Sequence, residues 1–269
     1  MTAILLVGCG KMGGAMLDGW IARGASPSDI TVVEPNAELA DTLRQRHGVQ
    51  VLDGANGLDF GYAPDVVILA VKPQMMDAVL PAFADIPGHP VFLSIAAGRT
   101  IAGFEAALGG ATAIVRAMPN TPAAVGRAVT VCCPNAHVTD AQRTLCQNLL
   151  AAVGQVEWIA DEVHMDAVTA VSGSGPAYVF LMAEALAEAG RRAGLDPELA
   201  ERLARATVAG AGELLHHSSV AAHTLRQNVT SPGGTTAAAL EILMGETGLT
   251  DLMDKAVAAA ARRSKELAN

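Results

Sequence analysis

Residues 3–13 read AILLVGCGKMG, a short apolar run that leads directly into three glycines with the spacing GxGxxG. The apolar run predicts a strand over Ala3–Val7, and the pattern that follows predicts a helix from about Met12 to Ala22. Glycines between a strand and a helix let the backbone turn tightly and approach a pyrophosphate, which then lies at the helix N-terminus. A glycine-rich turn without a ligand is the alternative. We expect a dinucleotide-binding loop made of Gly8, Cys9, Gly10, Lys11, Met12 and Gly13.

The chain continues to about residue 160 with short apolar runs that alternate with helical patterns. This alternation predicts βαβ units and an α/β domain with a mainly parallel, Rossmann-like sheet. We expect further strands at residues 30–34, 49–52, 66–71, 91–95, 113–118 and 129–133, and a second helix at residues 37–47.

After residue 161 the strand patterns stop and long Ala/Leu/Glu helices are predicted at residues 178–193, 197–216, 236–245 and 252–267. Two stretches, 204–212 and 256–261, are apolar around most of the helix and must be buried, which indicates a homodimer formed through the helical half. We therefore predict a dinucleotide-binding Rossmann domain at residues 1–160 and an all-helical dimerisation and substrate-binding domain at residues 161–269.

The composition argues against several function classes. The net charge is −9 and no basic cluster is large enough for nucleic acid. No window holds the roughly eighteen apolar residues of a membrane span, and the apolar run at Ile4–Val7 lacks the basic segment of a signal peptide. The 4 cysteines and 7 histidines show no metal-site spacing. We expect a cytoplasmic protein that binds no metal, no nucleic acid and no membrane.

Glu34 ends the second predicted strand, about twenty residues after the last glycine of the loop. An acid at this position can accept hydrogen bonds from the ribose hydroxyls of the cofactor and repels a 2′-phosphate. Glu34 therefore favours NADH over NADPH. The alternative is an exposed acid that touches no ligand.

Two tight loops end later strands, at the sheet edge where open α/β folds bind their ligands. One is Ala70-Val71-Lys72-Pro73, in which Lys72 contacts a cofactor phosphate or is an ordinary solvated lysine. The other is residues 118–122, MPNTP. Its two prolines make a rigid loop that could hold the Asn120 amide against a nicotinamide carboxamide.

Two segments of the helical half contain more glycines and hydroxyls than a helix–helix turn requires. They are SGSGPAY at residues 172–178 and NVTSPGGTT at residues 228–236. Free N–H groups at a helix N-terminus form a site for a small carboxylate. An ordinary turn with Ser or Thr caps is the alternative.

Six segments together resemble one enzyme family, in the same order along essentially the whole chain. They are VVILAVKPQ (66–74), SIAAG (94–98), VRAMPNTP (115–122), AVTAVSGSGPAY (167–178), VTSPGGTTAAAL (229–240) and RSKEL (263–267). The sequence resembles the pyrroline-5-carboxylate reductases. The two segments from the helical half are specific to that family, whereas the glycine loop is common to many dehydrogenases.

The resemblance implies an oxidoreductase of proline biosynthesis that transfers hydride from NADPH or NADH to the C=N bond of 1-pyrroline-5-carboxylate, giving L-proline. It implies dimers that often assemble into decamers. It implies a cofactor site lined by Asn56, Ala70, Val71, Lys72, Pro73, Ala96, Ala97, Asn120 and Pro176. It implies a substrate site made of Glu162, Asn228, Ser231, Gly233, Gly234, Thr235 and Thr236, with the Thr236 hydroxyl near the ring nitrogen as the catalytic group.

The chain departs from the family pattern at two places. Members that use NADPH tend to carry a small hydroxyl residue where Glu34 stands, and Ala128 replaces a second glycine after Ala124-Val125-Gly126. Neither departure touches the segment expected to bind the imine.

Two other functions compete with this interpretation. A reductase of the β-hydroxyacid dehydrogenase class would carry a Lys and, four residues later, an Asn on the helix after Ser172–Gly175, and this helix has no such pair. A non-catalytic NAD(P)-binding sensor would keep the glycine loop but lose the hydroxyls of Ser231, Thr235 and Thr236, which are present.

Overall fold

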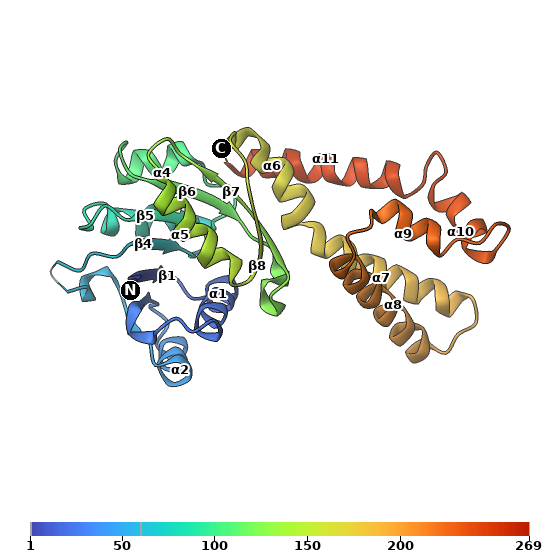
Figure 1. Ribbon diagram of the computed structural model, residues 1–269, viewed down its shortest axis with the longest axis horizontal. Helices are drawn as coiled ribbons and strands as arrows, with labels where there is room; N and C mark the ends of the chain where they lie inside the picture. Colours follow the sequence, from blue (N-terminus) through green and yellow to red (C-terminus); the bar gives the residue numbers. More distant parts are fainter. Residues whose placement is uncertain (1, 60, 269) are drawn as a thin grey trace. The chain divides into compact units, whose positions relative to one another are not determined.

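An eight-stranded sheet occupies the N-terminal part of the chain in the computed structural model, which describes residues 2–59 and 61–268 (Figure 1). The strand order is β3-β2-β1-β4-β5-β6-β7-β8, and every neighbouring pair is parallel except β6 and β7. The strands are β1 Ile4–Val7, β2 Ile30–Val33, β3 Gln50–Leu52, β4 Val66–Leu69, β5 Val91–Ser94, β6 Ile114–Met118, β7 Ala128–Pro134 and β8 Gly154–Trp158. The predicted mainly parallel sheet is confirmed.

Helices cover both faces of the sheet, which explains why its central strands are continuously apolar. The helices here are α1 Lys11–Ala22, α2 Ala37–His47, α3 Met76–Val79, α4 Ile101–Leu108, α5 Asp140–Ala151 and α6 Met165–Val168. Side chains of α1, α2 and α5, including Met16, Leu43 and Leu150, form the core on one face. Phe104 of α4, with Met76 of α3, belongs to the core on the other face.

The chain reverses its direction of winding between β1 and β4. These strands are neighbours in register, with Val7 beside Leu69, although β2 and β3 lie between them in sequence. In open α/β sheets a crevice forms at this point, outside the carboxyl ends of the strands, and ligands bind there. The loops after β1 and β4 are therefore the loops expected to hold a cofactor.

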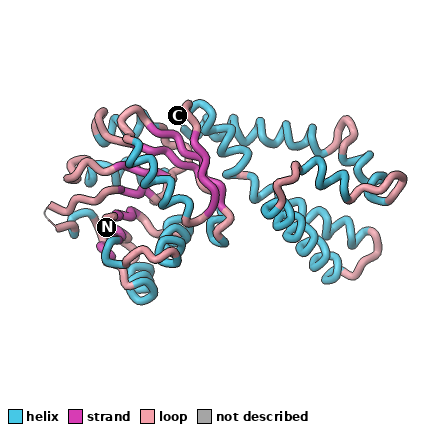
Figure 2. The backbone as a smooth tube through the Cα atoms, viewed as in Figure 1, coloured by secondary structure: helices cyan, strands magenta, loops and turns pink. Residues whose placement is uncertain are grey.

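The C-terminal part is helical, as predicted, and no strand occurs in its described residues (Figure 2). Its helices are α7 Gly175–Arg192, α8 Pro197–His217, α9 Ala222–Asn228, α10 Thr235–Leu243 and α11 Leu249–Ala268. α7 and α8 pack closely because small residues face each other: a Cβ atom at Gly190 would lie 3.3 Å from the Cβ of Ala200. Asp196 begins α8 by accepting hydrogen bonds from the N–H groups of Glu198 and Leu199.

By its contacts, the chain divides into two compact units. The first consists of Met1–Gly173 with Ala261–Asn269, and the second of Ser174–Ala260. α11 therefore begins in the second unit and ends in the first. Its end is held there by the Ser264 hydroxyl, which donates to Asp166 Oδ1 over 2.7 Å.

Several elements differ from the sequence-based expectation. The strand expected at 66–71 ends at Leu69, because Ala70 and Val71 turn toward the glycine loop. Six helices and strands were missed, namely β8, the short helices α3 and α6, and the helices α4, α5 and α9. β8 is a short edge strand with polar residues at alternate positions, which weakens its apolar signal.

Candidate active site

The glycine loop has the geometry that a dinucleotide requires. Gly8 has φ +85°, a conformation that glycine adopts without strain, and a Cβ atom there would lie 2.8 Å from Val71 Cγ1. A Cβ atom at Gly13 would lie 2.6 Å from the carbonyl oxygen of Gly8. At Gly10, by contrast, a Cβ atom would meet nothing within 4 Å. The first and third glycines thus serve packing, and the second leaves open space at the start of α1.

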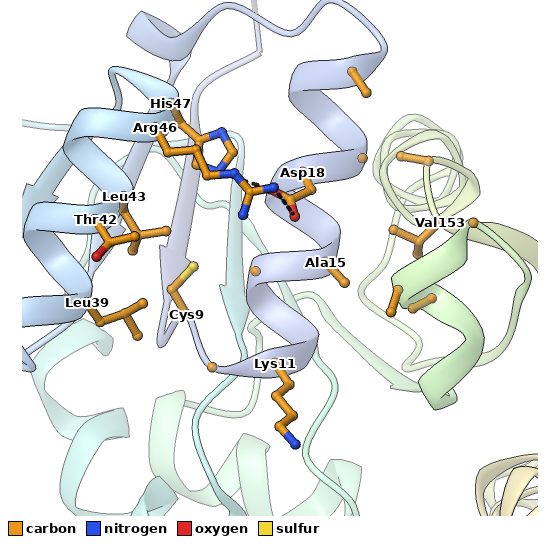
Figure 3. A pocket seen from close by; sticks show the side chains of 18 residues that line it. Cys9, Lys11, Ala15, Asp18, Leu39, Thr42, Leu43, Arg46, His47 and Val153 are labelled. Atoms are coloured by element: carbon orange, nitrogen blue, oxygen red, sulfur yellow. Dashed lines mark hydrogen bonds and ion pairs between the residues drawn. The ribbon is translucent and has the colours of Figure 1, made fainter.

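The start of α1 is free to bind an anion. Gly10 is its N-cap, and no side chain caps the helix. The amide groups of its first turn, together with the helix dipole, favour a pyrophosphate in the space beside Gly10. The loop residues therefore fit a dinucleotide cofactor. The Lys11 side chain is exposed and extends away from the helix (Figure 3).

Glu34 lies between the glycine loop and the start of α2. Its Oε2 accepts a hydrogen bond from the Cys9 N–H over 2.9 Å, and its Oε1 accepts one from the Asn36 N–H over 3.0 Å. The carboxylate therefore connects the two loops that flank the expected adenosine ribose site. Burial, followed by the charges of Glu34 and Asp18, raises the pKa of the Cys9 thiol to about 12, so Cys9 stays protonated.

The other residues expected to bind the cofactor lie in loops of the first unit. Ala70 and Val71 contact the glycine loop directly, whereas Lys72 is exposed beside them. Ala96 is buried and Ala97 is exposed, both in the loop after β5. Asn56 is exposed in a short 3₁₀ turn, Ala55–Gly57.

Asn120 is almost fully buried, and both ends of its amide contact the backbone. Its Oδ1 accepts from Val129 N–H over 3.0 Å, and its Nδ2 donates to the Ser172 carbonyl over 3.1 Å. Ser172 belongs to a π-helical turn, Thr169–Gly173, and lies four residues before Pro176, the second residue of α7. Because proline has no N–H, it cannot donate to the Ser172 carbonyl, and Asn120 satisfies that carbonyl instead.

Glu162 is held by two donors, which the sequence did not indicate. Arg116 Nη1 lies 2.6 Å from its Oε1, and the Ile101 N–H donates to the same oxygen over 2.9 Å. Arg116 was missed as a functional candidate, although a single arginine inside an apolar strand is an unusual pattern. The Cys133 thiol lies nearby, and its pKa is raised by burial and by the charge of Glu162.

The second glycine-rich loop connects α9 to α10 in the second unit. Gly233 has φ +66°, and Gly234 is the N-cap of α10 with no side chain bonded to the helix end. Thr235 is exposed and Thr236 half-buried on its first turn. The other members of the predicted substrate set in this loop, Asn228 and Ser231, are exposed. Exposed hydroxyls around an uncapped helix N-terminus suit a small carboxylate.

A cavity of about 620 Å³ extends along α1, with α2 on one side and residues 123–126 and 152–153 on the other (Figure 3). It reaches the glycine loop only at Cys9, Gly10 and Lys11. Asp18 on its wall pairs with Arg46 over 3.1 Å and with His47 over 3.0 Å. None of residues 70–73, the loop after β4, lines the cavity, so it does not span the crevice between β1 and β4 and we do not assign the cofactor to it.

Two other kinds of site were sought in the described parts of the chain. No three His, Cys, Asp or Glu side chains come together there as a potential metal site. Within residues 2–59 and 61–268, no helix has the length and apolar content of a membrane span.

Comparison with known proteins relates both parts of the chain to oxidoreductases. A family described as NADP oxidoreductase, coenzyme F420-dependent, matches residues 3–98, and one described as pyrroline-5-carboxylate reductase dimerisation matches residues 162–267. Pyrroline-5-carboxylate reductase of Pseudomonas aeruginosa is 40% identical over 98% of this chain and 96% of its own length.

Solved structures agree with this relationship. A pyrroline-5-carboxylate reductase from Coxiella burnetii has a TM-score of 0.94 at 38% identity, covering 100% of this chain and 99% of that chain. Plasmodium falciparum pyrroline carboxylate reductase with NADP bound has a TM-score of 0.83 at 29% identity, covering 100% of this chain and 98% of that chain. The resemblance found in the sequence motifs is confirmed: the chain belongs to the pyrroline-5-carboxylate reductase family.

Proposed function

We propose that this protein reduces the C=N bond of 1-pyrroline-5-carboxylate with NADPH or NADH, giving L-proline. The observation that carries the proposal is the 40% identity over 98% of the chain to a protein of that name. The glycine loop at the β1–β4 crevice supports it, because a hydride donor bound there is what the reaction needs. The β-hydroxyacid dehydrogenase alternative is disfavoured because the helix after Ser172–Gly175 lacks the Lys and Asn pair of that class.

The first experiment is steady-state oxidation of NADH and of NADPH, each with and without pyrroline-5-carboxylate. Oxidation that depends on the imine would establish the reaction. Folded protein without turnover would refute it and leave the non-catalytic NAD(P)-binding sensor as the better description.

For the cofactor, we infer a preference for NADH. Glu34 carries its negative charge at the end of β2, where the adenosine ribose binds in this fold, and a charge there repels a 2′-phosphate. Its hydrogen bonds to Cys9 and Asn36 hold the carboxylate in that place. Glu34→Ser should therefore shift the ratio of kcat/KM values toward NADPH. Glu38→Ser, which removes an exposed acid from the first turn of α2, is the matched control. NADPH preferred by the wild type would contradict the inference.

For the substrate, the proposal assigns the carboxylate to the amide groups around Gly233, Gly234 and Thr235. The Thr236 hydroxyl lies near the ring nitrogen, where it polarises the imine or relays a proton through water. Asn228, Ser231 and Glu162 complete the set. Holding the donor and acceptor carbons in contact supplies the remaining catalysis. With the exception of Pro176 in the cofactor set, the proposal assigns the dinucleotide to residues 1–160 and substrate and dimerisation to residues 161–269, the two domains expected from the sequence.

We also propose a homodimer formed through the helical part. The family matching residues 162–267 is described by dimerisation, and the second unit exposes many large apolar side chains. On α7 alone these are Val179, Phe180, Leu181, Met182 and Leu186. A second copy would cover such a surface. Sedimentation or light scattering should give at least twice the mass of one chain; the decamer and the cytoplasmic location remain predictions.

A further inference from the structure

Arg116 is a charged side chain buried inside the sheet. It lies in β6, beside Ser94 of β5 and Cys133 of β7, and is 5% exposed. Among the described residues it is the only charged residue that is buried. Burying a charge is costly in free energy unless the charged group is paired and hydrogen-bonded.

Its partner is Glu162, and the pairing is asymmetric. Both donors, Arg116 Nη1 and the Ile101 N–H, bind Oε1. No group in the described part of the chain donates to the second oxygen, Oε2. The Glu162 side chain is 27% exposed, against 6% for Arg116, so the carboxylate lies at the outer end of the pair.

The pair lies where the fold binds ligands. Ile101 begins α4, directly after the loop that leaves the carboxyl end of β5 and contains Ala96 and Ala97. Stability alone does not explain a buried ion pair, because well-packed apolar residues of similar volume are often equally stable or more so. A side chain such as methionine would satisfy the packing around residue 116 without an ion to desolvate.

We propose that Arg116 is a positioning residue for the substrate-binding carboxylate: it fixes Oε1 of Glu162, so that Oε2 faces the protonated imine and stabilises its positive charge. This inference rests on the proposed reduction of pyrroline-5-carboxylate. A protonated imine is the better hydride acceptor, and a fixed carboxylate stabilises it. The substrate also carries its own carboxylate. Because Arg116 offsets part of the Glu162 charge, the pair repels that group less than an isolated carboxylate would, while the exposed side of Glu162 still faces the imine.

The test is steady-state kinetics on Arg116→Met, Arg116→Lys and Glu162→Gln, with thermal unfolding of each variant. Arg116→Met should raise KM for the imine by roughly tenfold or more, as expected for losing one charge-assisted hydrogen bond, and leave KM for the cofactor within about twofold. Arg116→Lys should recover part of the loss, since lysine keeps the charge without the planar fork. The double variant Arg116→Met/Glu162→Gln should have the same KM for the imine as Glu162→Gln alone, because Arg116 acts through Glu162. Arg46→Met, which removes an exposed pair with Asp18, is the control.

A merely structural role has a different signature. If folded Arg116→Met keeps the wild-type KM for the imine, or if both KM values rise together, the inference is overturned. Should Arg116→Met fail to fold, Arg116→Lys decides: an unchanged KM for the imine in that variant overturns it. No turnover by the wild type would overturn the proposed reaction itself, and this is seen before any variant is compared.

Discussion

Replacing Gly10 with alanine should weaken cofactor binding without destabilising the fold. The main effect of Gly13→Ala, by contrast, should be a lower unfolding free energy. At Gly10 the added methyl group meets no protein atom within 4 Å, but it fills the space into which we place the pyrophosphate. At Gly13 the methyl group would lie 2.6 Å from the Gly8 carbonyl oxygen, a backbone atom that cannot move aside freely.

The magnitudes follow from these two environments. Displacing the pyrophosphate from one N–H donor forfeits a charge-assisted hydrogen bond of about 1.5–3 kcal/mol, so Kd for NADH should rise about 10- to 100-fold in Gly10→Ala. Its unfolding free energy should stay within about 0.5 kcal/mol of the wild type, as for an open surface position. The clash in Gly13→Ala should destabilise by about 1–3 kcal/mol, or roughly 2–12 °C in Tm.

The assay pairs thermal unfolding with titration of NADH by fluorescence. Both tryptophans, Trp20 and Trp158, lie in the first unit and report on the part that holds the glycine loop. Wild-type affinity in folded Gly10→Ala would show that the pyrophosphate does not approach there. Equal destabilisation by both substitutions would show that a methyl group at Gly10 contacts the protein, contrary to the open space described there.

Three further predictions concern the core, the thiols and the substrate loop. Among the described buried side chains, the Thr130 hydroxyl alone has no hydrogen-bond partner, so Thr130→Val should stabilise by about 1 kcal/mol and raise Tm by roughly 2–4 °C; a lower Tm would contradict this. Burial raises the pKa of Cys146 from 9.0 to about 12, so the unfolded chain loses this proton first and stability falls as pH rises from 9 toward 12. Between pH 8 and pH 10 the unfolding free energy of the wild type, measured with denaturant, should fall by about 1.4 kcal/mol more than that of Cys146→Ala. The same pH dependence in both proteins would show that Cys146 does not cause the loss. Thr236→Ala should lower kcat/KM for the imine at least about tenfold with an unchanged Tm, while Thr250→Ala on α11 should not; wild-type turnover in Thr236→Ala would remove the proposed role of the hydroxyl.

Some missed elements had readable signals. α5 begins with a capping box, in which Thr139 and Gln142 bond each other's backbone N–H groups, and that pattern is visible in the sequence as Thr-x-x-Gln. Thr100 is the N-cap of α4, and its hydroxyl accepts from the Gly103 N–H. β8 had only a weak signal, because it is an edge strand in which exposed and half-buried residues alternate. Local patterns were thus sufficient for helix ends and insufficient for the sheet edge.

The sequence by itself determined the strand–glycine–helix unit, the mainly parallel sheet and the family. The strand–glycine–helix unit and the sheet depend on short-range spacing and residue periodicity, which the chain displays directly, whereas the family came from the resemblance of six segments to known enzymes. Only the tertiary structure decided what the polar side chains do. Glu34 bonds the backbone of both flanking loops, Asn120 satisfies a carbonyl that Pro176 cannot, and Arg116 holds Glu162 from 46 positions away. Apart from the Glu34–Asn36 bond, which joins residues two positions apart, these partners are brought together by strand order and loop path, and the residues next to each side chain in sequence do not indicate them.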